Sequence, residues 1–513
     1  MKRYFKLLWK EIFVRLFFHV IYITAIAALP YIIKNMIDCG FLNGWYDVVK
    51  WVGVFITFII LGMAAQYITQ RGAWKLDKKL YENIRQDFFE ALITQTPETY
   101  KSKEIGEYTS MINNDIAGCE EYVEYIMQIC EAVIGLIVYA SYIFCLDIRI
   151  ACIIYITAVL TLFLPRITGD KLSSKKQVLL KKTGIYTNKV FDLLSGISFV
   201  NHDTFEKVAA RHNDSLYEME KSRYEYGKFK TFTNVLNGSV MYIINTAAFA
   251  IIAVLLCAGS ITAGIATATI SYIQDFMFPL RTIVDSISSV KSVRGVKNRI
   301  IAVIEGRRKI IYEETGFKRA IRLNHVSKKY EDFSIDDFSY TFEKGKKYAI
   351  IGPSGTGKST LVKMIVQEIK QDSGDIYIDD KIAEYDVCNT LMFYIGQYSH
   401  IFAENYPDNV TMFGSYKYKE ALKGYISEGK YGLLAQTDNC TTLSGGEKQL
   451  IVLERALLSE REILVLDEPF SALNQELDMQ VNKKLMESDK TIIIVTHNES
   501  SEYLKGFDYI IKM

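Results

Sequence analysis

Gly352-Pro-Ser-Gly-Thr-Gly-Lys-Ser-Thr360 is the stretch that decides the fold of the C-terminal part of this 513-residue chain. It fits the phosphate-loop pattern G-x-x-x-x-G-K-[ST], in which glycines let backbone N–H groups turn inward around a phosphate at a helix N-terminus. The apolar run Tyr348–Ile351 before it is typical of a buried strand, and Thr360–Val366 after it is typical of an apolar helix. The alternative is a glycine-rich turn before a core helix. The complete motif in strand–loop–helix order favours a phosphate loop.

The side chains of this loop fit ATP and Mg²⁺ as cofactors. Lys358 is predicted to contact the β- and γ-phosphates, and the hydroxyl of Ser359 is predicted to hold Mg²⁺. The predicted ATP-binding residues of the loop are Gly352, Ser354, Gly355, Gly357, Lys358, Ser359 and Thr360.

A second apolar run, Glu462-Ile-Leu-Val-Leu-Asp467, ends in carboxylates. A central parallel strand has this pattern when its C-terminal end opens on a phosphate site. Asp467 is predicted to complete the Mg²⁺ shell through water, and Glu468 to polarise the attacking water as a general base. The alternative is a simple turn at Asp467-Glu-Pro469.

Leu443-Ser-Gly-Gly-Glu447, followed by Lys448 and Gln449, resembles the signature sequence of ATP-binding cassette (ABC) proteins. The order of the motifs makes this resemblance specific. It implies that the signature of one subunit closes over the ATP held by the phosphate loop of another, with a helix N-terminus offering donors to the γ-phosphate. The residues predicted to act in trans are Ser444, Gly445, Gly446 and Glu447.

The same resemblance implies roles for residues that alone would more often be structural. Tyr330 resembles the aromatic that stacks on adenine, Gln397 the glutamine that meets Mg²⁺ and the γ-phosphate, and His497 the switch histidine. The loop along the dimer seam is predicted to be Ser471, Ala472, Leu473 and Asn474. Asn474 stands where the family usually has Asp, which could weaken cross-talk between two ATP sites. Together these assignments predict Glu468, His497 and Gln397 as catalytic residues and Ser359, Gln397 and Asp467 as Mg²⁺ ligands.

The first three hundred residues carry apolar stretches that approach the length needed to cross a bilayer. They predict six spanning helices, whereas a buried core helix is the alternative for any single stretch. The last is the weakest, because it contains Gln274, Asp275 and Pro279. The six stretches are 16–33, 52–68, 132–146, 148–164, 235–256 and 261–280.

Charge predicts the orientation of these helices. The segment Asp38–Asp47, between the first two stretches, has no Lys or Arg, whereas basic residues lie before the first stretch and after the second. The positive-inside tendency therefore predicts that both termini and the ATPase domain are cytoplasmic. The basic residues concerned are Lys2, Arg3, Lys6, Arg71, Lys75, Lys78 and Lys79.

Two long connections between apolar stretches, residues 70–127 and 166–234, have a charged, helix-forming composition. We therefore expect them to extend the spanning helices into the cytoplasm. Gly106–Ser110 with Asn113–Asp115 resembles the first intracellular elbow of the exporter branch of the ABC family, and Leu194–Val200 resembles the second. The predicted fold is an all-α six-helix transmembrane domain (1–305), a linker (306–318) and an α/β P-loop ATPase domain with antiparallel β and helical subdomains (319–513).

Composition excludes several other classes of protein. The net charge is +1 and no basic block rich in aromatic residues occurs, so nucleic-acid binding is not indicated. Eight cysteines are scattered without a CxxC pair, which argues against a disulfide framework or a zinc site.

The sequence predicts a half-transporter, which needs a second half-transporter chain to form a homodimer or a heterodimer in a lipid bilayer. Its predicted activity is ATP hydrolysis coupled to export of a peptide, lipid or hydrophobic small molecule by alternating access. An ATP-gated channel or regulatory subunit is one alternative, and an importer with the exporter fold is another. The chain is predicted to be a multi-pass protein of a bacterial cell membrane.

Four polar or charged residues are candidates for lining a central cavity: Glu131, Asn245, Gln274 and Asp275. For each of them, a hydrogen bond between two helices is the alternative.

Overall fold

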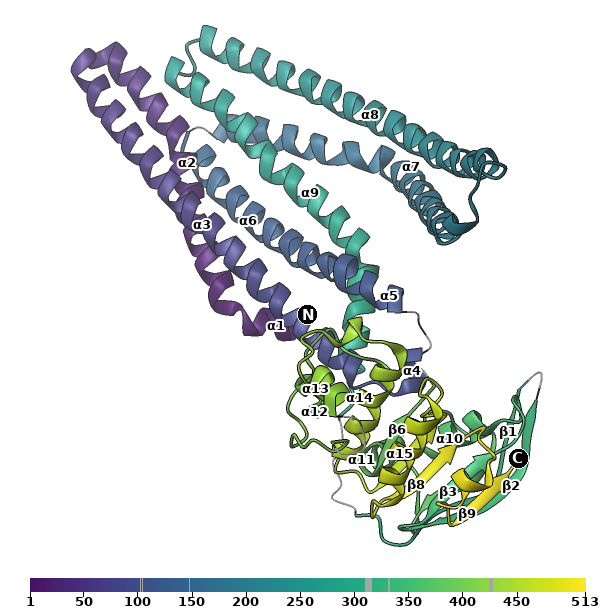
Figure 1. Cartoon of the computed structure of the whole chain (residues 1–513). Coiled ribbons are helices and arrows are strands. Elements are labelled where there is room, and N and C mark those ends of the chain that lie inside the picture. The colour runs from purple at the N-terminus through teal and green to yellow at the C-terminus, as the bar shows by residue number, and fades with distance from the viewer. Residues whose placement is uncertain are drawn as a thin grey trace. The chain divides into compact units, whose positions relative to one another are not determined.

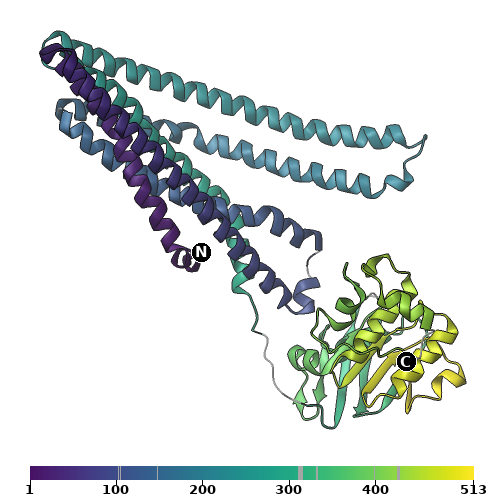
Figure 2. The same ribbon diagram turned by 60° about the vertical axis from the view of Figure 1, so that its left-hand side comes forward.

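The computed structural model describes residues 1–101, 103, 105–146, 148–309, 316–330, 333–397, 399–423 and 428–513 (Figures 1 and 2). These residues form two compact units. The first, the membrane unit, consists of Met1–Phe89 and Tyr108–Glu305, and the second, the cassette unit, of Glu90–Glu107 and Gly306–Met513. The predicted domain boundaries stay predictions, and residues 310–315 of the predicted linker lie outside the described residues.

Among the described residues, six long helices make up most of the membrane unit, and each overlaps one of the six predicted apolar stretches. They are α2 (Trp9–Asn43), α3 (Trp45–Ile93), α6 (Ile116–Leu146), α7 (Ile148–Ser195), α8 (Phe205–Cys257) and α9 (Ala263–Glu305). Within the described residues, Trp9–Gly40, Trp45–Ile93 and Ile105–Leu146 contain stretches long and apolar enough to cross a membrane, and Asn245–Cys257 is the apolar C-terminal part of α8.

Short helical elements occupy both predicted elbows. Helices α4 (Pro97–Lys101) and α5 (Ile105–Ser110) and a π-helical turn, Met111–Asp115, lie between α3 and α6. A 3₁₀ turn, Ile197–Phe199, lies between α7 and α8, and α1 (Lys2–Leu7) precedes α2.

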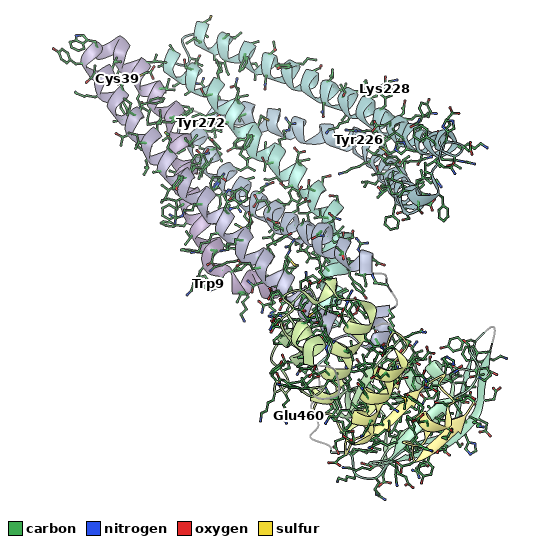
Figure 3. All side chains as sticks on the ribbon, in the orientation of Figure 1. Trp9, Cys39, Tyr226, Lys228, Tyr272 and Glu460 are labelled. Carbon is green, nitrogen blue, oxygen red and sulfur yellow. The ribbon has the colours of Figure 1, made fainter. Side chains whose placement is uncertain are left out.

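Helix α9 packs along α6 and also against α2. The hydroxyl of Tyr272 on α9 (Figure 3) donates to the carbonyl of Ala27 on α2 at 2.7 Å. At the start of α9, Oδ1 of Asp38 accepts the Gly264 N–H at 3.1 Å, and the Thr262 hydroxyl donates to Oδ2 of Asp38 at 3.0 Å. Asp38 therefore caps the N-terminus of a neighbouring helix, where free N–H groups and the helix dipole favour a carboxylate.

A buried cation ties α2 to α6. The Arg15 side chain is only 4% exposed; its guanidinium donates to Glu131 at 2.6 Å and to both carboxylate oxygens of Glu124 at 2.7 and 3.0 Å. A buried charge needs such partners. Glu131, a candidate for the central cavity, thus makes a contact between two helices, which is the alternative given for it in the sequence analysis. The assignment of Asn245, Gln274 and Asp275 to a cavity stays a prediction.

Helices α7 and α8 pack along one another as a hairpin, and both views show the end with residues 195–205 standing away from the other helices of the membrane unit (Figures 1 and 2). Lys182 pairs with Glu218 at 3.1 Å, and the Tyr186 hydroxyl lies 3.0 Å from the His212 ring. Large apolar side chains on the hairpin end are exposed, and Phe199 is the extreme case at 81%. They are Phe191, Leu194, Ile197, Phe199 and Phe205.

The cassette unit contains two sheets. The first is antiparallel, in the order β2-β1-β4-β5, and consists of β1 (Ala320–Lys329), β2 (Ser334–Glu343), β4 (Ser373–Ile378) and β5 (Lys381–Ile382). The second is parallel, in the order β6-β7-β8-β3-β9, and consists of β3 (Lys347–Ile351), β6 (Met392–Ile395), β7 (Ile463–Asp467), β8 (Thr491–Val495) and β9 (Tyr509–Lys512). The predicted α/β domain with an antiparallel part is confirmed.

Every residue of β3, β7 and β8 is buried, as their continuous apolar sequences require of central parallel strands. The remaining elements are helices α10 (Lys358–Ile365), α11 (Tyr385–Leu391), α12 (Tyr406–Thr411), α13 (Glu428–Ala435), α14 (Gly445–Leu458), α15 (Gln475–Met486) and α16 (Ser501–Leu504), with a 3₁₀ turn at Cys440–Thr442.

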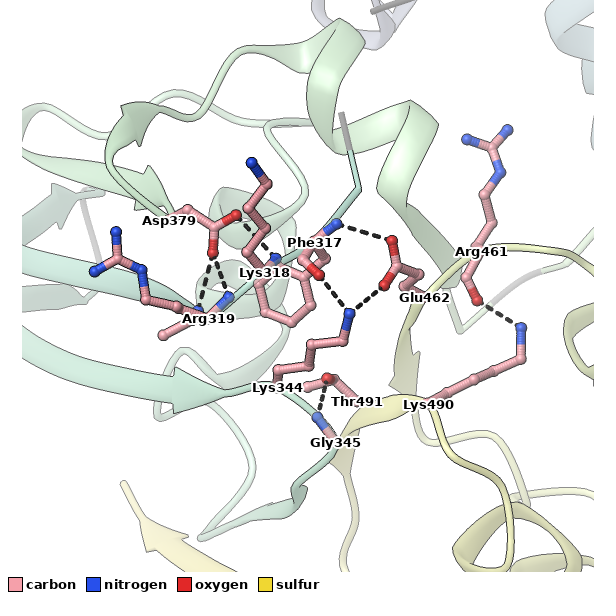
Figure 4. A network of polar contacts seen from close by, with 11 residues as sticks. Phe317, Lys318, Arg319, Lys344, Gly345, Asp379, Arg461, Glu462, Lys490 and Thr491 are labelled. Atoms are coloured by element: carbon pink, nitrogen blue, oxygen red, sulfur yellow. Dashed lines mark hydrogen bonds and ion pairs between the residues drawn. The ribbon is translucent and has the colours of Figure 1, made fainter. Parts of the chain in front are cut away.

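A polar network anchors the chain where it enters the cassette unit (Figure 4). The buried Phe317 donates its N–H to Glu462 at 2.8 Å, and Lys344 bridges the other oxygen of Glu462 at 2.7 Å and the Phe317 carbonyl at 2.5 Å. Asp379 accepts the N–H groups of Lys318 and Arg319 at 3.0 and 2.6 Å. Since Glu462 directly precedes β7, the network fixes the entering chain beside that strand.

Gly264→Ala should destabilise the membrane unit, because its Cβ would lie 2.4 Å from the Lys34 carbonyl oxygen, a backbone atom. Overpacking of this kind costs about 1–3 kcal/mol, so the thermal unfolding midpoint of the detergent-purified chain should fall. Gly295→Ala in the same helix meets nothing within 4 Å and is the matched control. Equal midpoints for the two variants would contradict this close approach of α2 and α9.

Candidate nucleotide site

The predicted phosphate loop lies between β3 and α10, in the expected strand–loop–helix order. Gly355 and Gly357 have φ values of 88° and 92°, which favour glycine, and a Cβ on Gly352 would lie 2.4 Å from the Met513 carbonyl oxygen. The buried Lys358 ammonium donates to the carbonyls of Gly352 and Pro353 at 2.8 and 2.7 Å. A cation and a helix N-terminus therefore meet at one glycine-rich loop, as phosphate binding requires.

Parallel pairing brings the end of β7 beside this loop. The Ser359 hydroxyl on α10 donates to Oδ1 of Asp467 at 3.1 Å. Burial raises the pKa of the Asp467 carboxyl above its ordinary value, and the hydrogen bond from Ser359 opposes that rise. A hydroxyl and a buried carboxylate are oxygen ligands of the kind Mg²⁺ takes, so these two residues fit the predicted ion.

Glu468, the next residue, lies in a strained backbone conformation. Its φ is 50°, in the left-handed region that few non-glycine residues adopt, and its N–H donates to the Val495 carbonyl at 3.0 Å. Its Oε1 lies 2.9 Å from Nε2 of His497, which follows β8. The structure therefore brings the predicted general base and the predicted switch histidine into contact at the carboxyl edge of neighbouring strands. Such strain often accompanies function.

Two other predicted site residues follow the ends of strands, one in each sheet. Gln397 follows β6, which pairs in parallel with β7, so its backbone lies at the same sheet edge as Asp467. Tyr330 follows β1, and its ring stacks on Phe333 at 5.0 Å between centroids. The Phe333 ring also limits the space at Gly357, where a Cβ would approach it to 3.0 Å. An exposed aromatic face is thus linked to the phosphate loop through one intervening ring.

The signature residues begin helix α14 with a capping box. The Ser444 hydroxyl donates to Oε2 of Glu447 at 2.6 Å, the same oxygen accepts the Ser444 N–H at 2.9 Å, and the Glu447 N–H reaches the Ser444 hydroxyl at 3.4 Å. Ser444 and Gly445 are exposed at the start of this 14-residue helix. Their action in trans stays a prediction.

The predicted seam loop packs against the signature. A Cβ on Gly446 would lie 2.8 Å from the Ala472 carbonyl oxygen, and Asn474 caps α15 by accepting the Leu477 N–H at 3.0 Å. Asn and Asp are equally good caps, so the departure at position 474 preserves this structural role. Gln449, to which the sequence assigned no role, joins the loop to α14: its Oε1 accepts the Ala472 N–H at 2.9 Å.

Comparisons with known proteins decide the family. Residues 12–280 match the model of the ABC transporter transmembrane region, and residues 335–471 match the ABC transporter model. This chain belongs to the ABC transporter family. It is an integral membrane protein with a nucleotide-binding ATPase domain fused to its helical domain, and it couples ATP hydrolysis to transport.

Its relatives span nearly its whole length. The ATP-dependent lipid A-core flippase of Haemophilus ducreyi is 22% identical over 93% of this chain and 86% of the flippase. A putative multidrug export ATP-binding/permease protein of Staphylococcus aureus is 25% identical over 88% of this chain and 82% of its own length. A bacterial Atm1-family ABC exporter with ATP bound has the same fold, with a TM-score of 0.82 at 16% identity over 99% of this chain and 94% of that exporter.

A buried carboxyl group in α14 also escaped the sequence analysis. Glu454 is fully buried and accepts hydrogen bonds from the Tyr406 hydroxyl, from the Tyr431 hydroxyl at 3.0 Å and from the Leu422 N–H at 3.4 Å. It thereby ties the signature helix to α12 and α13. Burial raises the pKa of Glu454 from 4.5 to about 7. Its one sequence signal is an acidic residue within the apolar run Leu450–Leu458.

The raised pKa of Glu454 predicts a pH-dependent contribution to stability. The folded state prefers the protonated carboxyl, so the contribution is full below about pH 4.5 and is lost as the pH rises through about 7. Between pH 5.5 and 8.5 the loss should be about 2 kcal/mol. Glu454→Gln, which cannot ionise, should therefore gain stability relative to wild type over that interval in denaturant melts of the full chain. Glu502→Gln, at an exposed position, is the control and should track wild type. A constant difference between Glu454→Gln and wild type would contradict the raised pKa.

Proposed function

We propose that this chain is one half of an ATP-driven exporter in which two cassettes enclose ATP between the phosphate loop of one chain and the signature of the other. The observation that carries the proposal is the convergence of Lys358, the Ser359–Asp467 pair and the Glu468–His497 pair at one edge of a parallel sheet. These groups supply a phosphate clamp, oxygen ligands and a base, the parts that phosphoryl transfer to water needs.

The proposed chemistry follows from the contacts of these side chains. Lys358 and the loop N–H groups bind the phosphates and hold the γ-phosphate in place. Glu468 accepts a hydrogen bond from the attacking water and draws its proton, while His497 fixes the orientation of that carboxylate. Mg²⁺, held by Ser359, Asp467 and Gln397, would supply charge neutralisation of the phosphate oxygens.

Two surfaces support a second half-transporter chain as partner. The end of the α7–α8 hairpin exposes several large apolar side chains, including Phe199, which a second chain would remove from water. The exposed α14 N-terminus offers backbone N–H groups to an anion, which would also replace Glu447 as the acceptor of the Ser444 hydroxyl. Because ATP would contact both chains, it would favour the closed dimer over the open one and so drive the membrane helices between two states. The partner is a second copy or a related half-transporter.

The transported substrate is proposed only by class. Lipid A-core flippase and multidrug export relatives favour a lipid or a hydrophobic small molecule, with a peptide as the remaining class. The charge pattern supports cytoplasmic termini, and the bacterial origin of the relatives supports a bacterial cell membrane. The presence of Glu468 favours an exporter that hydrolyses ATP over an ATP-gated channel or regulatory subunit, because gating by ATP binding alone does not need a general base.

Glu468→Gln should keep ATP binding and trap the closed dimer, while ATP turnover in liposomes falls by about 10²-fold or more, because the base is lost. Lys358→Ala should lose binding of a fluorescent ATP analogue, because the ammonium group proposed to bind the β- and γ-phosphates is removed. Glu499→Gln and Lys370→Ala, both exposed, are the matched controls. Turnover at the wild-type rate in Glu468→Gln would refute its assignment as base.

Glu447→Gln should strengthen the response to ATP. The amide oxygen can still accept the Ser444 N–H, but a negative charge is removed beside the hydroxyl proposed to meet the γ-phosphate in trans. Removing one like charge at a partly exposed site should lower the KM for ATP by about two- to fivefold. ATPase assays across ATP concentrations, with Glu502→Gln as the control, measure this change. An unchanged or higher KM would argue against the trans contact.

A further inference from the structure

Gln449 makes contacts at both ends of its side-chain amide. On one end, Oε1 accepts the Ala472 N–H at 2.9 Å. On the other, Nε2 lies 3.4 Å from both the Glu468 carbonyl and the Ser471 hydroxyl. A single side chain on the signature helix therefore reaches the seam loop and the backbone of the proposed general base.

The seam loop is held from a second side by the signature itself. The Ala472 carbonyl oxygen lies so close to Gly446 that a Cβ there would approach it to 2.8 Å. The two polar groups of Ala472 thus face the same helix, the N–H through Gln449 and the carbonyl against Gly446. A displacement of the α14 N-terminus cannot leave Ala472 in place without breaking a hydrogen bond or creating a clash.

Such a displacement also bears on Glu468. Its backbone is held in the left-handed region with φ of 50°, a conformation that persists only where neighbouring groups enforce it. Its carbonyl accepts the Ser471 N–H at 3.3 Å as well as the contact from Gln449. Both contacts come from the elements that Gln449 joins, so a shift of α14 reaches the peptide that sets the direction of the Glu468 side chain.

We propose that Gln449 is a positioning residue that couples the two ATP sites of the dimer. The proposal rests on the proposed function, in which the signature of a chain contacts the partner's ATP and Glu468 of the same chain acts on that chain's own ATP. Gln449 connects these two groups within one cassette. Closure of the signature over one ATP therefore sets Glu468 at the other site.

Two substitutions separate the ends of the amide. Gln449→Met keeps the length of the side chain and removes all three polar contacts. Gln449→Glu keeps an acceptor for the Ala472 N–H and replaces the donor that faces the Glu468 carbonyl by an oxygen, which repels it. Gln480→Met, on an exposed part of α15, makes the same chemical change away from these contacts and is the control.

The test measures ATP turnover of the full chain in liposomes and binding of a fluorescent ATP analogue over a range of concentrations. Gln449→Met should keep nucleotide affinity within about threefold, lose about 5- to 20-fold in kcat, and show a lower Hill coefficient for binding and for turnover than wild type. Gln449→Glu should lose kcat in the same way. A purely structural role would instead lower affinity, thermal midpoint and kcat together.

The proposal is overturned by a Hill coefficient equal to that of wild type, by an unchanged kcat, or by a fall in affinity that matches the fall in kcat. A wild-type chain that binds the analogue without turnover would defeat the proposed function. Gln449 would then still be judged by the cooperativity of binding, which requires no hydrolysis. The two failures are therefore distinguishable.

Discussion

Parallel pairing of β3, β8 and β7 is the constraint on which the nucleotide site depends. Parallel strands bring their carboxyl ends to one edge of a sheet, so Lys358, Asp467 and His497, which are separated by up to 139 positions in the printed numbering, meet there. The complete burial of these strands fixes the register, because a slip would expose apolar side chains and break the ladder. The Ser359–Asp467 hydrogen bond then closes the edge across α10 and β7.

The parts of this site that the sequence could predict are those encoded by a local pattern. The phosphate loop and the run ending at Asp467 place glycines and carboxylates by spacing alone, and the strand and helix around Gly352–Thr360 formed where expected. Gln449 and Glu454 could not be predicted, because their partners lie up to 48 positions away and depend on how α14 packs. The left-handed backbone conformation of Glu468 has no sequence signal either, because glycine is the residue that usually occupies a position with positive φ.

Residues in the membrane unit show a similar limit. Apolar runs predicted the long helices, because the length of such runs is a direct signal. The contacts that align the helices have no such signal: nothing in the sequence pairs Arg15 with Glu131, and only the packing of α2 against α6 places Glu131 between these helices and not in a cavity. In lipid, apolar side chains gain little by choosing one apolar neighbour over another, so a few polar contacts decide the register. Their partners cannot be read from one helix at a time.

One local arrangement recurs in both units. A short polar side chain occupies a helix N-terminus: Asp38 at α9 from a neighbouring helix, and Ser444 and Asn474 at α14 and α15 from within the chain. Free N–H groups make that end a natural receptor for an acceptor oxygen. At α9 the receptor is filled by a carboxylate of the protein, which fixes two helices together. At α14 the Ser444 hydroxyl donates to Glu447 of the same helix, so this cap is closed within one element. The same physical feature therefore joins two helices in the membrane unit and caps a single helix from its own N-terminal residue in the cassette unit.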